Sequence, residues 1–175
     1  MSEPAVVLVG AAGAGKTTVG RALAASLGTD FVDSDDVLAE AAGMPLDQLM
    51  VGLGEAAYRQ REGAAVLAAL SRIGSVVALG SGSLADPGTR RRLSELPVAW
   101  LRVSAANAAN RSGLNVPRPV GLGNVRATMA ALIAAPEPHY AEVADVEVDT
   151  DFREIDDIVA ELLAALGRKG SAHVG

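Results

Sequence analysis

Short apolar runs alternate along the chain with longer segments in which apolar residues recur at helical spacing. Strands alternating with helices indicate an α/β fold, in which helices cover both faces of a five-stranded parallel sheet. No internal repeat interrupts the alternation, so residues 1–175 are expected to form a single domain that ends in a disordered tail at about 167–175. The predicted strands span residues 6–9, 31–33, 76–79, 98–103 and 146–149. The predicted helices span residues 19–27, 37–42, 45–51, 55–70, 87–93, 105–111, 125–135 and 155–166.

A glycine-rich stretch joins the first predicted strand to the first predicted helix and fits the pattern G-x-x-x-x-G-K-[ST]. Its small residues let the backbone curl around a polyphosphate, so that successive N–H groups and the helix N-terminus point at the phosphates. Lys16 is expected to reach the β- and γ-phosphates, and the Thr17 hydroxyl is a candidate Mg²⁺ ligand. The predicted triphosphate-binding residues are Gly10, Ala11, Ala12, Gly13, Ala14, Gly15, Lys16, Thr17 and Thr18.

The composition narrows the class of protein. The chain has 175 residues, which is enough for one domain with a substantial core. Half of the residues are hydrophobic but only 3% are aromatic, which suits helices packed on a small parallel sheet. The chain has no cysteine, which excludes disulfides and a thiol nucleophile. We see neither a signal peptide nor an apolar run long enough to span a membrane, and we expect a cytoplasmic protein with no membrane partner.

The charge of the chain argues against binding to nucleic acid. The formal net charge is −6 and the isoelectric point is about 4.9, the opposite of a basic binding surface. Lysine occurs at only two positions, Lys16 and Lys169, and the second lies in the predicted tail. The one lysine expected within the folded body is therefore the lysine that the glycine-rich loop requires.

Two acidic residues, Asp33 and Asp35, follow the second predicted strand. The carboxyl ends of parallel strands are where α/β sheets bind their ligands. One carboxylate can approach Mg²⁺ while the other accepts the proton of a hydroxyl that attacks the γ-phosphate. The alternative is that Asp33-Ser34-Asp35 simply caps the next helix, since Asp and Ser are favoured there. The neighbouring glycine-rich loop favours the catalytic interpretation.

Three further features are open to a functional and to a purely structural interpretation. Gly80-Ser81-Gly82 follows the third strand, where glycine permits a close approach of a ligand, although an ordinary loop has the same pattern. Arg59 and Glu62 are three residues apart on one helix face, and spacing alone favours a simple surface pair. A segment rich in Gly, Asn and Pro at about 111–126 suits a mobile lid that carries arginine to the phosphates, or else a disordered linker.

Taken together, these motifs resemble those of the shikimate kinases, and the resemblance extends along nearly the whole chain, from about residue 6 to 166. The motifs are specific as an ordered set rather than singly. The matching segments are residues 10–21, Phe-Val-Asp-Ser-Asp at 31–35, Gly-Glu-Ala-Ala-Tyr-Arg-Gln-Arg-Glu at 54–62, Leu-Gly-Ser-Gly at 79–82, Arg-Ser-Gly-Leu-Asn-Val-Pro-Arg-Pro at 111–119, Tyr-Ala-Glu-Val-Ala-Asp at 140–145 and Val-Asp-Thr at 148–150.

The resemblance implies a fold like that of the nucleoside monophosphate kinases, with a mobile lid. It implies transfer of the γ-phosphate of ATP, with Mg²⁺, to a hydroxyl of shikimate or a closely related cyclic polyol acid, by a protein that we expect to be a monomer. The catalytic residues would be Lys16, Asp35 as the base, and Arg118 of the lid, and the metal ligands would be Thr17 and Asp33. The acceptor would bind at Asp35, Arg59 supported by Glu62, Gly80, Ser81 and Gly82, and ATP would also contact Arg111, Arg118 and Arg153, with Arg111 and Arg153 near the adenine.

The chain departs from the family mainly on the acceptor side. Ser81 stands where the family has the middle one of three glycines, and Val120-Gly121 replaces a pair of leucines. Pro136, followed by Glu137, occupies the position of a second carboxylate-binding arginine, whose loss would cost about 1.5–3 kcal/mol. Two alternatives therefore stay open: the same kinase machinery with a less acidic acceptor, or a catalytically degenerate protein that binds ATP and acts as a regulator.

Overall fold

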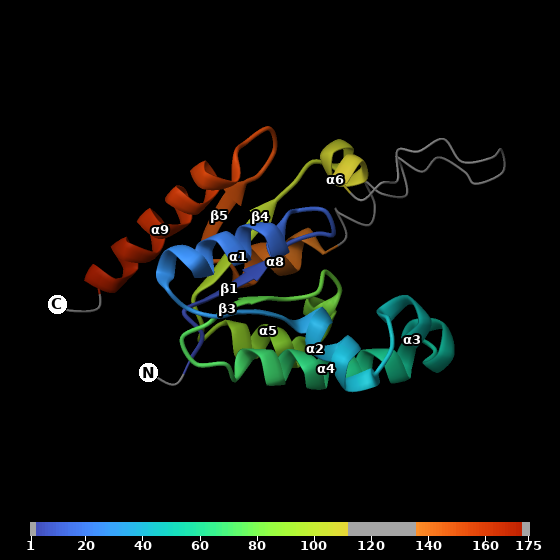
Figure 1. Ribbon diagram of the computed structural model, residues 1–175. Helices are drawn as coiled ribbons and strands as arrows, with labels where there is room; N and C mark the ends of the chain where they lie inside the picture. The colour runs from blue at the N-terminus through green and yellow to red at the C-terminus, as the bar shows by residue number, and fades with distance from the viewer. Residues whose placement is uncertain (1–2, 112–135, 173–175) are drawn as a thin grey trace.

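The computed structural model describes residues 3–111 and 136–172, and these form one α/β sandwich around a parallel sheet (Figure 1). The strand order is β2-β3-β1-β4-β5, so β1, which precedes the glycine-rich loop, lies at the centre. All four strand pairings are parallel, as the alternation of strands and helices predicts. The strands are β1 (Val6–Val9), β2 (Phe31–Asp33), β3 (Val76–Ala78), β4 (Val98–Arg102) and β5 (Val146–Asp149).

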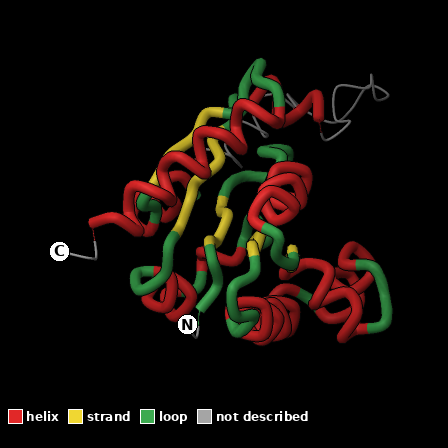
Figure 2. Tube along the Cα trace, turned by 60° about the vertical axis from the view of Figure 1, so that its left-hand side comes forward, coloured by secondary structure: helices red, strands yellow, loops and turns green. Residues whose placement is uncertain are grey.

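Helices cover both faces of the sheet, as Figure 2 shows. They are α1 (Lys16–Leu27), α2 (Ser34–Ala42), α3 (Leu46–Leu53), α4 (Glu55–Leu70), α5 (Pro87–Leu93), α6 (Ala105–Arg111), α8 (Glu137–Val143) and α9 (Ile155–Ala172), with a short 3₁₀ helix, η1 (Ser83–Ala85), between β3 and α5. None of the helices in the described ranges is long and apolar enough to cross a lipid bilayer.

The alternation of side chains along each strand divides the core into two layers. Leu8 and Leu101 face a layer that contains α1, α6 and α9. Val7, Val77 and their neighbours face the opposite layer, which contains α4, α5 and α8. A smaller apolar cluster joins α2, α3 and α4 beside the sheet, at the lower right of Figure 1. Both faces of β1, β3 and most of β4 are thus buried, which explains why these strands read as continuous apolar runs.

The structure corrects the predicted ends of several elements. The last helix continues to Ala172, so residues 167–172 are helical and the tail predicted there is wrong. Helix α2 begins at Ser34 rather than Val37 because Asp33 caps it. Helix α8 occupies residues for which no element was predicted. The predicted helix at 125–135, and the predicted lid beyond Arg111 with Arg118 and Val120-Gly121, lie outside the described residues.

Candidate active site

The glycine-rich loop between β1 and α1 has the backbone shape that its glycines permit. Gly13 and Gly15 have φ values of 82° and 88°, which residues with a Cβ rarely adopt. Gly10 combines a φ of 153° with a close approach to the neighbouring strand, since a Cβ there would lie 2.5 Å from the Leu101 carbonyl oxygen. The loop therefore leads directly into the N-terminus of α1 at Lys16, and the first turn of that helix faces the carboxyl edge of the sheet.

Lys16 lies across the loop that it would serve. Its Nζ donates to the carbonyl oxygens of Gly10 at 2.6 Å and Ala11 at 3.0 Å. Burial lowers the pKa of Lys16 to about 8, against the opposing effect of the Asp35 and Asp33 charges. A half-desolvated ammonium held at the centre of the loop is well placed to bind an anion that enters it.

Thr17 and Asp33 form a pair of oxygens beside the loop. The Thr17 hydroxyl donates to Asp33 Oδ2 at 3.0 Å, and Asp33 Oδ1 accepts from the backbone N–H of Asp35 at 2.9 Å. Asp33 thus caps α2, as the structural interpretation predicts, and its other carboxylate oxygen also reaches Thr17, so the role in binding Mg²⁺ stays a prediction. In the described ranges no three or more His, Cys, Asp and Glu side chains converge. One carboxylate and one hydroxyl suit Mg²⁺, which binds few protein ligands and completes its shell with phosphate oxygens and water.

Asp35 and Gly80 meet at the ends of β2 and β3. A Cβ at Gly80 would lie 2.5 Å from Asp35 Oδ1, so the glycine leaves the space that the carboxylate fills. Burial raises the pKa of the Asp35 carboxyl, the charge of Asp33 raises it further, and Lys16 opposes both. A carboxylate with a raised pKa is a better proton acceptor than an ordinary surface aspartate, as a general base requires.

Buried hydroxyl groups fix the glycine turn, Gly80-Ser81-Gly82, which follows β3. The backbone N–H of Gly80 donates to Ser34 Oγ at 3.0 Å, and the Ser83 hydroxyl donates to the Gly80 carbonyl at 2.7 Å. The Tyr140 hydroxyl, from α8, donates to the carbonyl of Ser81 at 2.8 Å. These supporting residues were not predicted as part of the site. They come from separate elements of the chain, and no sequence pattern relates them to the turn.

Arg59 and Glu62 of α4 face the same turn. Their side chains pair at 2.7 Å, as the spacing predicts, but Glu62 is only 7% exposed, so one partner of the expected surface pair is buried. A Cβ at Gly82 would lie 2.5 Å from the guanidinium of Arg59. The pair keeps a half-exposed guanidinium against the glycine turn, because the buried carboxylate of Glu62 holds it there. Tyr58 lies close enough to Glu62 and Asp35 that their charges help to raise its pKa, although burial contributes most.

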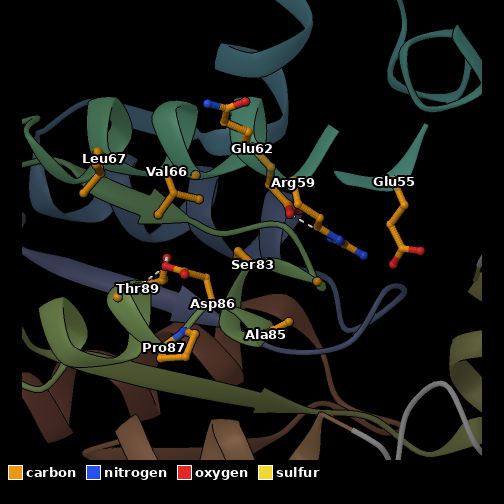
Figure 3. A pocket seen from close by; sticks show the side chains of 14 residues that line it. Glu55, Arg59, Glu62, Val66, Leu67, Ser83, Ala85, Asp86, Pro87 and Thr89 are labelled. Carbon is orange, nitrogen blue, oxygen red and sulfur yellow. Dashed lines mark hydrogen bonds and ion pairs between the residues drawn. The ribbon is translucent and has the colours of Figure 1, made fainter. Parts of the chain in front are cut away.

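A cavity of about 720 Å³ lies on the far side of this pair, between α4 and the η1–α5 segment (Figure 3). Figure 3 shows Arg59 and Glu62 pointing toward one another at its wall, with Ser83 and Pro87 opposite. Gly82 belongs both to this cavity and to the turn beside Asp35. The cavity therefore adjoins the predicted acceptor side of the site and not the glycine-rich loop.

Two of the three arginines predicted to contact ATP lie in the described residues, and they differ in their contacts. Arg111, at the end of α6, donates to the Gly13 carbonyl at 3.2 Å and to the hydroxyl and carbonyl of Thr150 at 3.1 and 2.8 Å. It therefore ties the loop after β5 to the glycine-rich loop. Arg153 pairs with Glu161 at 2.6 Å and also contacts the carbonyls of Asp149 and Asp157. Its guanidinium is held by its own turn and by α9.

The site as a whole brings together Lys16, Thr17, Asp33, Asp35, Arg59 and the glycine turn at one edge of the sheet.

The profile of the family described as shikimate kinase matches residues 12–167. The shikimate kinase of Saccharopolyspora erythraea is 45% identical over 92% of this chain and 93% of its own length, and that of Salinispora tropica is 42% identical over 93% and 98%.

Solved structures agree with this assignment. The shikimate kinase from Acinetobacter baumannii, determined in complex with shikimate, is 29% identical, has a TM-score of 0.86 and covers 95% of this chain and 94% of its own. The shikimate kinase of Aquifex aeolicus, at 22% identity, shares the fold with a TM-score of 0.77, over 97% of this chain and 99% of its own. The five-stranded sheet, the glycine-rich loop and the motifs at the strand ends have one common explanation: the chain is a small-molecule kinase that belongs to the shikimate kinase family.

Proposed function

We propose that this protein transfers the γ-phosphate of ATP to a hydroxyl of shikimate. The observation that carries the proposal is the meeting of Asp35, Arg59 and the glycine turn beside the glycine-rich loop. A carboxylate and a cation then lie on one side of the predicted triphosphate site, on either side of the same glycine turn. The A. baumannii shikimate kinase, determined with shikimate, supports the same acceptor for this chain.

The proposed division of labour follows from the chemistry of each side chain. Arg59, steadied by Glu62, binds the carboxylate of the acceptor. Asp35 accepts a hydrogen bond from the reacting hydroxyl and takes its proton as the oxygen attacks the γ-phosphorus. The bond between the γ-phosphorus and the bridging oxygen breaks, so the bridging oxygen stays on the β-phosphate of the departing ADP and the γ-phosphoryl group stays on the acceptor oxygen. Lys16 offsets the negative charge that spreads over the phosphate oxygens.

The Thr17 hydroxyl and the Asp33 carboxylate, which lie 3.0 Å apart, are the residues that would hold Mg²⁺. The ion would neutralise charge on the β- and γ-phosphates and keep them in one orientation. Arg118 is proposed as the arginine that approaches the phosphates from the lid, and it lies outside the described residues. The monomeric state and the cytoplasmic location stay predictions.

One observation favours a second candidate, a less acidic acceptor. Pro136, which precedes α8, stands where the resemblance places a second carboxylate-binding arginine, and Glu137 follows it with a charge of the wrong sign for that task. The described residues thus leave Arg59 as the cation at the glycine turn. Because a guanidinium can bind a carboxylate with two parallel hydrogen bonds, we propose that Arg59 suffices and that shikimate is the acceptor.

The test is ADP release, followed with coupling enzymes, from Mg·ATP and either shikimate or a panel of neutral cyclitols and sugar acids. Saturable turnover with shikimate, at a higher kcat/KM than with any neutral cyclitol, is the expected result. Turnover with a neutral acceptor and none with shikimate would replace the proposal by the second candidate. ATP binding without turnover on any acceptor would favour a regulatory protein instead.

A further inference from the structure

A chain of hydrogen bonds joins the buried residue Thr150, which directly follows β5, to the glycine-rich loop. Thr150 is only 1% exposed, and it ends the segment Val-Asp-Thr, to which the proposed function gives no task. Its backbone N–H and its hydroxyl both donate to the carbonyl oxygen of Arg102, at 3.0 and 2.8 Å. Thr150 is thus fixed to the end of β4, and its hydroxyl oxygen can still accept a hydrogen bond.

Thr150 orients the guanidinium of Arg111. Nη1 of Arg111 donates to the Thr150 hydroxyl oxygen at 3.1 Å, and Nη2 donates to the Thr150 carbonyl at 2.8 Å. Two bonds from one planar group to a buried residue fix the plane of the guanidinium, although Arg111 itself is exposed. A valine at position 150 would fill the same space and would lack the hydroxyl that takes part in this arrangement.

The oriented guanidinium reaches the glycine-rich loop at Gly13. Nη1 of Arg111 also donates to the Gly13 carbonyl at 3.2 Å, and Figure 1 shows α6, which ends at Arg111, beside the loop that leads into α1. The N–H of the same peptide unit belongs to Ala14, and it donates to the Ala11 carbonyl at 3.1 Å. Because a peptide unit is planar, the two bonds together hold it in one orientation.

This peptide unit needs support because glycines lie on both sides of Ala14. Gly13 and Gly15 have φ values of 82° and 88°, and glycine also adopts many other conformations at little cost. A loop of this kind binds phosphates through N–H groups that must point toward the ligand. A loop that is held in shape before the ligand arrives therefore binds more tightly than one that the ligand must order.

We propose that Thr150 is a positioning residue for the triphosphate: its hydroxyl orients Arg111, and Arg111 holds the peptide unit between Gly13 and Ala14 in the shape that receives phosphates. The inference rests on the proposed function, because it requires ATP in the glycine-rich loop. It goes beyond that function because a buried residue at the end of β5 then contributes to phosphate affinity without contacting the ligand.

The test uses the full chain and measures binding of Mg·ATP and of Mg·tripolyphosphate, which has the phosphates and lacks the base. Thr150→Val keeps the buried volume and removes the hydroxyl, whereas Thr150→Ser keeps the hydroxyl. In calorimetric titrations we expect Thr150→Val to weaken both ligands equally, by about 3- to 10-fold, and Thr150→Ser to restore most of the affinity. The KM for shikimate should not change, because the proposed acceptor residues lie at the ends of β2 and β3.

Two further measurements separate positioning from a general loss of stability. Arg111→Met removes the group through which Thr150 acts, so in that background Thr150→Val should change tripolyphosphate affinity less than about twofold. In the ligand-free protein, NMR should show faster water exchange of the Ala14 amide in Thr150→Val and an unchanged rate for the Val19 amide, which donates to Gly15 at the start of α1. If Thr150→Val does not fold, Arg111→Met, at an exposed position, gives the same Ala14 measurement.

Unchanged tripolyphosphate affinity in Thr150→Val would overturn the inference, and so would a loss confined to ATP, since Thr150 would then serve the nucleoside. Additive losses in Thr150→Val and Arg111→Met would show that Thr150 does not act through Arg111. Weaker tripolyphosphate binding with unchanged exchange at Ala14 would also overturn it, because Arg111 would then contact the phosphates itself. The proposed function fails separately: absence of turnover on shikimate, with the expected binding pattern, would remove the acceptor and leave the role of Thr150 intact.

Discussion

At the scale of single residues, Asp35 is the residue on which the proposed chemistry depends most. Asp35→Asn removes the proton acceptor and keeps the shape of the side chain, so we expect kcat to fall about 100- to 10,000-fold. ATP affinity should change little, since Asp35 is not expected to contact the nucleotide. The measurements are steady-state turnover with shikimate and calorimetric binding of Mg·ATP.

The matched control is Asp36→Asn, which makes the same change at an exposed position one residue further along α2. It should leave both quantities near their wild-type values. If Asp35→Asn weakened ATP binding and left kcat unchanged, Asp35 would be a nucleotide ligand and not the base.

Lys16 gives the nucleotide site a pH dependence. Burial lowers the pKa of Lys16 to about 8, so the ammonium is charged below that pH and loses its proton above it. Because only the charged form attracts the phosphates, ATP affinity should fall by up to about tenfold for each pH unit above the pKa. Binding should also take up protons near pH 8, since bound phosphates raise the pKa of Lys16.

Calorimetry in two buffers of different ionisation enthalpy, across about pH 6.5 to 9.5, measures both effects. Affinity that stays constant through this range, with no proton uptake, would contradict the assigned state of Lys16.

At the scale of elements, α8 supports the proposed acceptor site through a hydrogen bond. The Tyr140 hydroxyl donates to the Ser81 carbonyl at 2.8 Å, and Tyr140 is only 1% exposed. Tyr140→Phe should cost about 0.5–1.5 kcal/mol of unfolding free energy and should raise the KM for shikimate while leaving ATP affinity unchanged. Chemical denaturation and steady-state kinetics test this. Equal KM values for the variant and the wild-type protein would show that the glycine turn needs no support from α8.

The lack of a side chain at Gly82 leaves the space that the Arg59 guanidinium occupies. Gly82 has a φ of −93°, which alanine adopts freely, but its Cβ would lie 2.5 Å from the guanidinium. Gly82→Ala should therefore displace Arg59 and raise the KM for shikimate about tenfold or more, since a charge-assisted bond contributes about 1.5–3 kcal/mol. The readout is the KM for shikimate beside the melting temperature.

Gly63→Ala is the control, because it lies on α4 with Arg59 and nothing is within 4 Å of the new Cβ. It should stabilise the helix by about 0.5–1 kcal/mol and leave the KM unchanged. A comparable rise in KM for both variants would indicate a general disturbance of α4.

The sequence predicts the elements that carry strong patterns and misses those that depend on tertiary contacts. The apolar runs of β1, β3 and β4 and the shorter patterns of β2 and β5 identify all five strands within a residue or so at their ends, since the middle of the sheet is buried on both faces. Helix α8 is only seven residues long and contains Pro138, which is too little periodicity to predict a helix. Gly167 suggests an end to α9, but a glycine weakens a helix by about 1 kcal/mol without stopping it.

Within the candidate site, the sequence predicts the residues with proposed chemical roles better than the residues that hold them in place. Lys16, Thr17, Asp33 and Asp35 lie in motifs, so their meeting follows from strand order. The burial of Glu62 could not be predicted, because the spacing from Arg59 shows that they share a helix face but not where that face points. The hydrogen bonds that join Ser34 and Tyr140 to the glycine turn also form only when the sheet and α8 are assembled.

At the scale of the whole molecule, the strand order places the residues proposed for the nucleotide and those proposed for the acceptor at the ends of different strands. The central strand β1 leads to the predicted triphosphate loop, β2 and β3 end at the proposed acceptor residues, and β4 and β5 end on the side where Arg111 contacts Gly13. In the proposed function, transfer between the two substrates takes place along one edge of a single sheet, and the binding of each substrate can be measured without the other.

The most direct test of this account is the kcat/KM for shikimate in the wild-type protein and in Arg59→Met, measured with saturating Mg·ATP. The neutral side chain of comparable length removes the cation proposed to hold the carboxylate, and Arg61→Met makes the same change at an exposed position of α4. We predict that Arg59→Met loses about ten- to a hundredfold in kcat/KM, with ATP affinity unchanged, and that Arg61→Met matches the wild-type protein. An unchanged kcat/KM in Arg59→Met would contradict the placement of the acceptor at the ends of β2 and β3.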